Sequence, residues 1–160
     1  MSIKEKWGNA CWFLFHTAAV KLKDDREDII PKLLNIIFNI SNNLPCPDCT
    51  EHARETLKRL KIDKITTKDS FIVFLHQFHN IVNIRAGNPQ FSKEDHDKKY
   101  KYAHLGNILK NFVYVMSDNY PTNNNNLMND MNRKRVVKNV AIFFANNADA
   151  FDQAICSETS

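Results

Sequence analysis

The chain has 160 residues, a net charge of +4 from 22 basic and 18 acidic residues, and four cysteines. This length suffices for one domain with an apolar core, and bases interspersed with acids do not by themselves indicate nucleic-acid binding. No apolar run is long enough to span a membrane, and the first residues lack the apolar segment of a secretory signal. We therefore expect a cytoplasmic protein without nucleic-acid or membrane partners, whose cysteines are redox groups or metal ligands.

Apolar residues recur at helical spacing along most of the chain, and only three glycines and five prolines are present. The sequence therefore predicts an all-α fold. A segment rich in asparagine, at 119–132, reads as a linker before the last helix. The helices are expected over residues 3–20, 29 to about 42, 46–60, 68–84, 92–116 and 133–154.

The first predicted helix carries one stripe of unusual composition. Gly8, Trp12 and His16 follow one another at four-residue spacing and so lie on the same face. Cys11 is offset from this stripe, and we expect it to be a small buried apolar side chain rather than a redox partner.

Two cysteines separated by two residues, Cys46 and Cys49, begin the third predicted helix. Pro47 suits the first helical position, which puts Cys46 near the N-cap. The partial positive charge of a helix N-terminus favours the thiolate form of cysteine, which is the reactive form, and this spacing allows the two sulfurs to form a disulfide. The spacing also fits half of a zinc site, with His76 and His79 as the other two ligands. At this point the redox and zinc interpretations are both open.

The fourth predicted helix has a polar face without charges. This face consists of His76, His79, Asn80 and Asn83, and no Lys, Arg, Asp or Glu occurs from Ser70 to Ile84. Such a face is typical of a buried surface that contacts a hydrogen-bonding group. A zinc site explains neither the two asparagines nor the stripe on the first helix.

Three blocks of residues occur along the chain: Gly8-x3-Trp12-x3-His16-Thr17-x-Ala19, Pro45-Cys46-x2-Cys49-x2-His52 and His79-Asn80-x-Val82-Asn83-x3-Gly87-x-Pro89-x-Phe91. In their order and spacing, these blocks together resemble the Erv/ALR family of FAD-linked sulfhydryl oxidases, in particular the short forms of large DNA viruses. The similarity covers about residues 6–102.

This resemblance implies a four-helix bundle with a short fifth helix over residues 1–103, which holds FAD. Residues 104–160 would then form a C-terminal helical extension. The resemblance also implies a homodimer, located in the host cytoplasm or in the virion if the protein is viral.

The resemblance assigns roles to the two cysteines and to a set of pocket residues. Cys49 would be the thiolate against the flavin, and Cys46 the sulfur attacked by the substrate thiolate. Asn88 stands where the family has a lysine, which leaves Arg85 and Lys99 as candidates for contacting the cofactor phosphates. The remaining cofactor-binding candidates are Gly8, Trp12, His16, His52, His79, Asn80, Asn83 and Tyr100.

The implied activity is the oxidation of protein thiols to disulfides, with O2 reduced to H2O2. The chain has no second CxxC or CxC pair to act as an electron shuttle, and only Cys11 and Cys156 are left over. Either Cys156 acts with a partner molecule, or substrate thiols reach Cys46 directly. We expect the latter, with proteins that have their own CxxC among the substrates. The alternative is a zinc-binding helical interaction module that uses Cys46, Cys49, His76 and His79.

Overall fold

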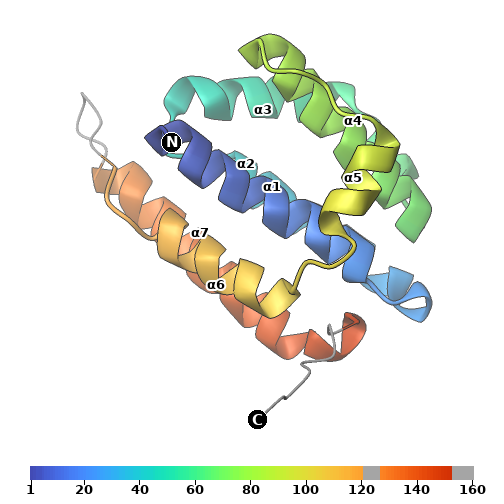
Figure 1. Ribbon diagram of the computed structural model, residues 1–160. Coiled ribbons are helices and arrows are strands. Elements are labelled where there is room, and N and C mark those ends of the chain that lie inside the picture. Colours follow the sequence, from blue (N-terminus) through green and yellow to red (C-terminus); the bar gives the residue numbers. More distant parts are fainter. Residues whose placement is uncertain (121–126, 153–160) are drawn as a thin grey trace.

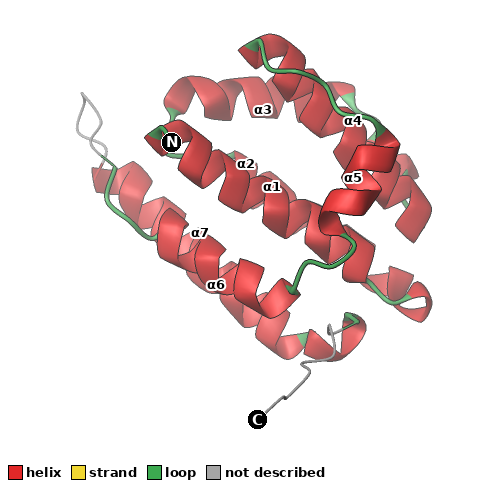
Figure 2. Ribbon diagram, in the orientation of Figure 1, coloured by secondary structure: helices red, strands yellow, loops and turns green. Residues whose placement is uncertain are grey.

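The structure is a computed structural model that describes residues 1–120 and 127–152. The secondary structure of these residues is helical, which confirms the predicted fold class (Figure 2). Three 3-10 turns, Asp24–Ile29, Ile62–Lys64 and Ala148–Ala150, accompany the helices. The helices are α1 (Ile3–Lys21), α2 (Ile30–Ser41), α3 (Pro47–Arg59), α4 (Lys68–Ala86), α5 (Lys93–Tyr100), α6 (Leu105–Met116) and α7 (Leu127–Asn146).

Local signals account for the ends of the two helices that matter most for the site. At the start of α1, Ser2 and Glu5 form a capping box, in which each side chain accepts a hydrogen bond from the other residue's backbone N–H. Thr67 and Ser70 form the same arrangement at the start of α4. Gly87 ends α4 with a φ of 72°, in the left-handed region that glycine adopts without steric cost.

Two of the predicted helices have other boundaries in the structure. The single helix expected over 92–116 is divided into α5 and α6, because His104 caps a new helix by accepting a hydrogen bond from the Asn107 N–H (3.2 Å). The last helix begins at Leu127, inside the predicted linker, and ends at Asn146 rather than at residue 154. The centre of that linker, at 121–126, and Cys156 lie outside the described residues.

Helix α1 runs through the middle of the molecule (Figure 1). Helices α4 and α5 contact it on one side, whereas α6 packs along its other side and in turn contacts α7. Helix α2 contacts both α3 and α7. Phe112 of α6 and Val137 of α7 are buried in the same apolar core as Leu14 of α1. The proposed division between residues 1–103 and a separate extension stays a prediction.

The segment that follows α7 is joined by backbone hydrogen bonds to the residues that follow α1. Leu22 and Phe151 form an isolated antiparallel bridge, with the Lys23 N–H donating to the Ala150 carbonyl at 2.9 Å. This bridge ties the C-terminal part of the described chain to the residues that follow α1.

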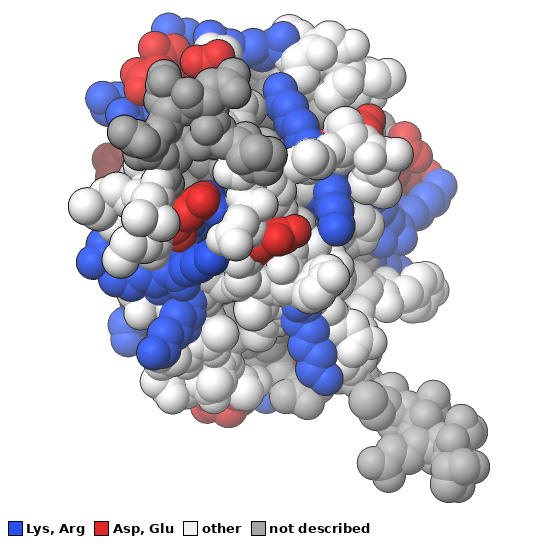
Figure 3. Space-filling model, turned by 90° about the vertical axis from the view of Figure 1, so that its left-hand side faces the viewer, with Lys and Arg blue, Asp and Glu red and all other residues white. Residues whose placement is uncertain are grey.

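The surface carries mixed charge. On the face that Figure 3 shows, basic side chains occur in several separate groups, with acidic and uncharged side chains between them. Within residues 1–120 and 127–152, no helix is both long and apolar enough to cross a membrane.

Candidate functional site

A cavity of about 480 Å³ lies between the first turns of α1, the start of α3 and the second half of α4. This volume is in the range of small-molecule and cofactor sites. Seven of the candidate catalytic and cofactor-binding residues line it: Gly8, Trp12, Cys49, His52, His79, Asn83 and Arg85. Cys11 and Asn88, which stood out in the sequence for other reasons, line it as well.

The two cysteines are joined by a disulfide, with their Cα atoms 5.2 Å apart. Cys46 is the N-cap of α3, and its sulfur accepts a hydrogen bond from the Cys49 N–H at 3.2 Å. Both residues are half-buried, but only Cys49 lines the cavity. The two sulfurs are therefore not equivalent, and Cys49 is the one that a molecule bound in the cavity can reach.

One wall of the cavity is aromatic. The rings of Trp12 on α1 and His79 on α4 stack with centroids 3.9 Å apart and planes 9° from parallel. Phe15 and Phe78, which also line the cavity, contact the indole edge-on, with ring centroids at 5.8 and 5.1 Å. Gly8 lies one turn before Trp12, and a Cβ at this position would meet open space. The wall thus offers flat aromatic surface beside an open segment of backbone.

Polar groups occupy the edges of the cavity. Asn83 is buried, and His52 is half-buried. The Arg85 guanidinium lies 3.7 Å from the Glu55 carboxylate and remains half-exposed. Arg85 is therefore placed where it could contact an anionic group of a bound molecule, whereas Lys99 is not among the residues that line the cavity.

Behind the aromatic wall lies a cluster of buried imidazoles. His16 is completely buried, and its Nε2 lies 2.9 Å from Nδ1 of His79. Its Nδ1 lies 2.5 Å from Nε2 of His96, which is also completely buried. Tyr100 stacks on His16 from the far side, with centroids 4.7 Å apart. His16 and Tyr100 support His79 rather than line the cavity.

The pKa values of these histidines are shifted downward. Burial lowers the pKa of His79 to about 3, with a smaller contribution from the positive charge of Lys99. Burial, followed by the neighbouring His96, lowers the pKa of His16 well below its usual value. Burial also lowers the pKa of His96, although the adjacent Asp97 opposes this shift. The cluster is therefore neutral at pH 7.

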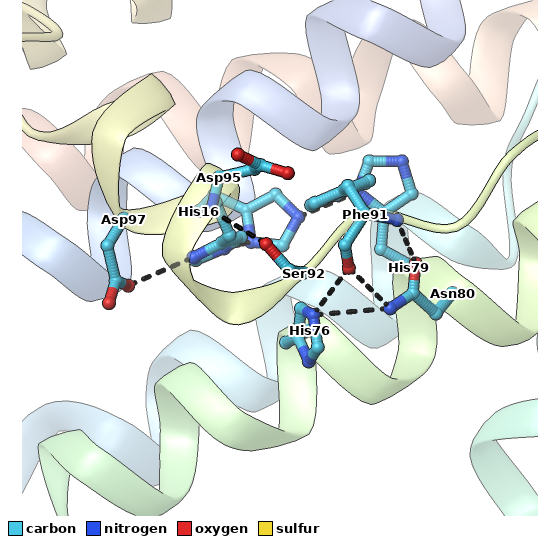
Figure 4. A network of polar contacts seen from close by, with 9 residues as sticks. His16, His76, His79, Asn80, Phe91, Ser92, Asp95 and Asp97 are labelled. Atoms are coloured by element: carbon cyan, nitrogen blue, oxygen red, sulfur yellow. Dashed lines mark hydrogen bonds and ion pairs between the residues drawn. The ribbon is translucent and has the colours of Figure 1, made fainter.

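Asn80 supports the segment that follows α4 (Figure 4). Its amide donates to the Phe91 carbonyl at 3.1 Å and accepts from the Phe91 N–H at 3.2 Å. His76 contacts the same carbonyl at 2.9 Å. Phe91, held in this way, packs edge-on against the ring of His79 with centroids 4.7 Å apart. Asn80 and His76 thus act on the cavity through Phe91.

Lys99 lies over aromatic rings, with its ammonium 5.0 Å from the Phe13 centroid and 5.6 Å from that of Tyr100. This cation–π contact holds it on the outside of α5.

The residues of the zinc alternative do not assemble. Cys46 and Cys49 are bonded to each other, and His76 is engaged with Phe91. In the part of the chain that the structure describes, no group of three or more His, Cys, Asp or Glu side chains is arranged to hold a metal ion.

The sequence did not point to His96, which lies in the strongly charged segment Lys93–Lys99 and reads there as solvent-exposed. One signal could have indicated that His96 is buried. It lies four residues before Tyr100, so both side chains project from the same face of α5. Ser41 and Lys4 also line the cavity, and nothing in their sequence context marked them.

Comparisons with known proteins agree with this geometry. The pattern of the Erv1 / Alr family matches residues 9–101. The protein 096R of Invertebrate iridescent virus 3 is 32% identical over 104 residues, which cover 63% of this chain and 70% of that protein. The FAD-linked sulfhydryl oxidase ERV1 of Oryza sativa subsp. japonica is 36% identical over 93 residues, or 55% of this chain and 45% of that protein.

A viral relative is covered almost completely. The FAD-linked sulfhydryl oxidase of African swine fever virus is 27% identical over 117 residues, which cover 70% of this chain and 91% of that protein. Comparison with solved structures gives no match. Since the family pattern spans more than half of the sequence and includes both cysteines and the aromatic wall, this chain belongs to the Erv1 / Alr family.

Proposed function

We propose that this chain is an FAD-linked sulfhydryl oxidase that converts protein thiols to disulfides through Cys46 and Cys49. The observation that carries the proposal is the Cys46–Cys49 disulfide at the start of α3, with one of its cysteines in the wall of an aromatic-lined cavity. Membership of the Erv1 / Alr family supports the same activity.

The first half of the reaction is thiol–disulfide exchange. A substrate thiolate attacks the Cys46 sulfur, a substrate–Cys46 disulfide forms, and Cys49 leaves as a thiolate. The second substrate thiolate then attacks the substrate sulfur of this mixed disulfide, and Cys46 leaves. One substrate disulfide has formed, and the electron pair resides on the reduced Cys46 and Cys49.

The start of α3 assists this exchange. Leaving sulfurs carry negative charge, and the Cys49 N–H that contacts the Cys46 sulfur at 3.2 Å stabilises that charge. The helix N-terminus adds its partial positive charge. Cys46 is therefore both the accessible electrophile and a stabilised leaving group.

The cavity has the features that FAD requires. Its aromatic wall offers stacking surface, Asn83 and His52 offer polar groups, and Arg85 offers positive charge. When bound, FAD supplies the electron acceptor that reoxidises the Cys46–Cys49 pair and passes the electrons to O2, which yields H2O2. Gly8, Trp12, His52, His79, Asn83 and Arg85 are the residues that we propose to contact it. His16, Asn80 and Tyr100 would support them from behind, and Lys99 would reach an anionic group only by leaving its aromatic contacts.

The partners and location follow from the same proposal. Thiol-containing proteins are the substrates, and those with their own CxxC can reach Cys46 without a shuttle cysteine. A homodimer in the host cytoplasm or in the virion is proposed from the resemblance to viral members. Light scattering on the purified protein measures the dimer directly.

The oxidase activity is tested with purified protein by flavin absorbance, O2 consumption and H2O2 production in the presence of a dithiol. The wild-type protein should be yellow and should consume O2. Cys49→Ser should retain FAD, because a serine preserves the cavity wall, but should lose at least a thousandfold in turnover.

Two outcomes would contradict the proposal. A colourless protein that holds stoichiometric zinc would support the interaction-module alternative instead. Full oxidase activity in Cys49→Ser would show that the assigned cysteine is wrong.

A further inference from the structure

Four side chains form a continuous line from the surface of α5 to the wall of the cavity. Asp97 is at the surface, with its carboxylate 3.4 Å from Nδ1 of His96. Nε2 of His96 contacts Nδ1 of His16, and Nε2 of His16 contacts Nδ1 of His79. Figure 4 shows Asp97 at one end of this line and His79 at the other, with His16 between them. Neither His96 nor Asp97 is among the residues proposed above to react with the substrate or to contact FAD.

The number of protons in this line is limited. Each neutral imidazole carries one N–H, and the line contains three contacts, each of which requires one proton between its two atoms. Three neutral histidines therefore supply the three protons that the three contacts require, and each N–H must point along the line toward its neighbour.

The carboxylate decides the direction in which the protons are arranged. An ionised Asp97 can only accept, so the proton of His96 belongs on Nδ1. His96 Nε2 is then an acceptor, which places the proton of His16 on Nδ1. His16 Nε2 is then an acceptor in turn, which places the proton of His79 on Nδ1. In the opposite arrangement, each proton would lie on Nε2, and the unprotonated Nδ1 of His96 would face the Asp97 carboxylate. Both atoms are hydrogen-bond acceptors, so they would repel each other.

We propose that Asp97 and His96 are positioning residues that fix the tautomer of His79, so that its Nε2 is an unprotonated hydrogen-bond acceptor for an N–H or O–H group of the bound cofactor. This inference rests on the proposed function only for the identity of the ligand. Among the described residues, only Nδ1 of His79 has a hydrogen-bond partner, which leaves Nε2 available to a molecule in the cavity.

The surroundings keep the line neutral and in place. Other charged or titratable groups near the imidazoles are Lys99 on α5 and His76 on α4, and both oppose protonation of the cluster. Trp12 stacks on His79, and Tyr100 stacks on His16, so neither ring can rotate freely. A fixed ring with a fixed tautomer discriminates between donors and acceptors more sharply than a mobile one.

The tautomer is measured by ¹⁵N NMR of histidine-labelled protein at pH 7, because protonated and bare ring nitrogens resonate at well-separated frequencies. The FAD-free and FAD-bound forms are compared. We expect His79 to be protonated at Nδ1 and bare at Nε2 in both forms. The test variant is Asp97→Asn, which preserves size and can donate a hydrogen bond to His96. It should increase the Nε2–H form of His79 and raise the FAD dissociation constant about five- to tenfold, the effect of one lost hydrogen bond.

Asp95→Asn is the matched control. It removes the same charge from the same helix, and the Asp95 carboxylate contacts no member of the line (Figure 4). This variant should leave the tautomer and the FAD affinity unchanged. His96→Phe, with its fold checked by circular dichroism, should reproduce the effect of Asp97→Asn on the His79 ring.

A wild-type His79 protonated at Nε2, or a tautomer unchanged in Asp97→Asn, would overturn the inference. The FAD-free spectrum reports the tautomer even if FAD does not bind. A failure of the proposed cofactor is therefore distinguishable from a failure of the proposed positioning.

Discussion

The indole of Trp12 and the imidazole of His79 stack almost parallel, with centroids 3.9 Å apart. These residues come from α1 and α4, which pack against each other on one side of the cavity. The stack joins the two stripes that stood out in the sequence into one wall. A flat aromatic group in the cavity can extend this stack, because stacked rings attract one another over the area that they share.

Replacing Trp12 should therefore weaken FAD binding more than it weakens the fold. We expect Trp12→Leu to raise the FAD dissociation constant about fivefold, since an aromatic pair contributes about 1 kcal/mol beyond buried area. Trp12→Phe, which retains a ring, is the control and should show a smaller increase. Fluorescence titration with FAD measures both. Equal affinities for Trp12→Leu and the wild type would show that the wall does not contact the cofactor.

The buried histidines should make the protein sensitive to acid. His79 has a folded-state pKa of about 3, below the ordinary value of 6.5, so the unfolded chain binds more protons between these two pH values. The contribution of His79 to the free energy of unfolding is then fully present above about pH 6.5. It is lost as the pH drops toward 3, by roughly 1.4 kcal/mol per pH unit. Urea denaturation at pH 7 and pH 5 measures the loss.

The contribution of His79 to acid sensitivity is separable by substitution. His79→Phe has a similar size and does not titrate, so its free energy of unfolding should fall less steeply between pH 7 and pH 5 than that of the wild type. The same slope in both proteins would show that other groups cause the acid sensitivity.

Residue patterns predicted the helices that carry the cysteines and the cavity wall. Helix α4 began and ended near its expected limits because Thr67 and Gly87 are local signals that need no tertiary context. The division between α5 and α6 was missed because neither glycine nor proline lies between Ser92 and His104. The break is marked instead by His104, whose ring accepts a hydrogen bond from the Asn107 N–H at the start of α6, and by Tyr100, which is buried against His16.

The site was predictable in part. Spacing placed Trp12 and His79 on helix faces, and the structure brings both to the cavity. Spacing alone does not distinguish a residue that lines a cavity from one directly behind it, as His16 shows. His96 lies in a charged segment, and only the packing of α5 on α1 reveals that it is buried.

Cys11 should be chemically inert in the folded protein. Its side chain is 4% exposed, its sulfur lies 3.8 Å from that of Met116, and burial raises the pKa of its thiol to about 12. In a Cys156→Ser variant with the Cys46–Cys49 disulfide intact, Cys11 is the one free thiol among the four cysteines. Alkylation at pH 8 should be at least a hundredfold slower than in urea. Labelling as fast as in urea would reopen a redox role for Cys11.

Arg133 anchors α7 to the end of α6. Its guanidinium is buried, lies 2.7 Å from the Asp130 carboxylate, and donates to the carbonyls of Met116 and Asp118 at 3.0 and 2.8 Å. Arg133→Met should lower the free energy of unfolding by about 3–5 kcal/mol, because it leaves a carboxylate and two carbonyls unpartnered. Arg135→Met, on the exposed face of the same helix, should cost less than about 0.5 kcal/mol. Urea denaturation measures both, and equal losses would refute the anchoring role.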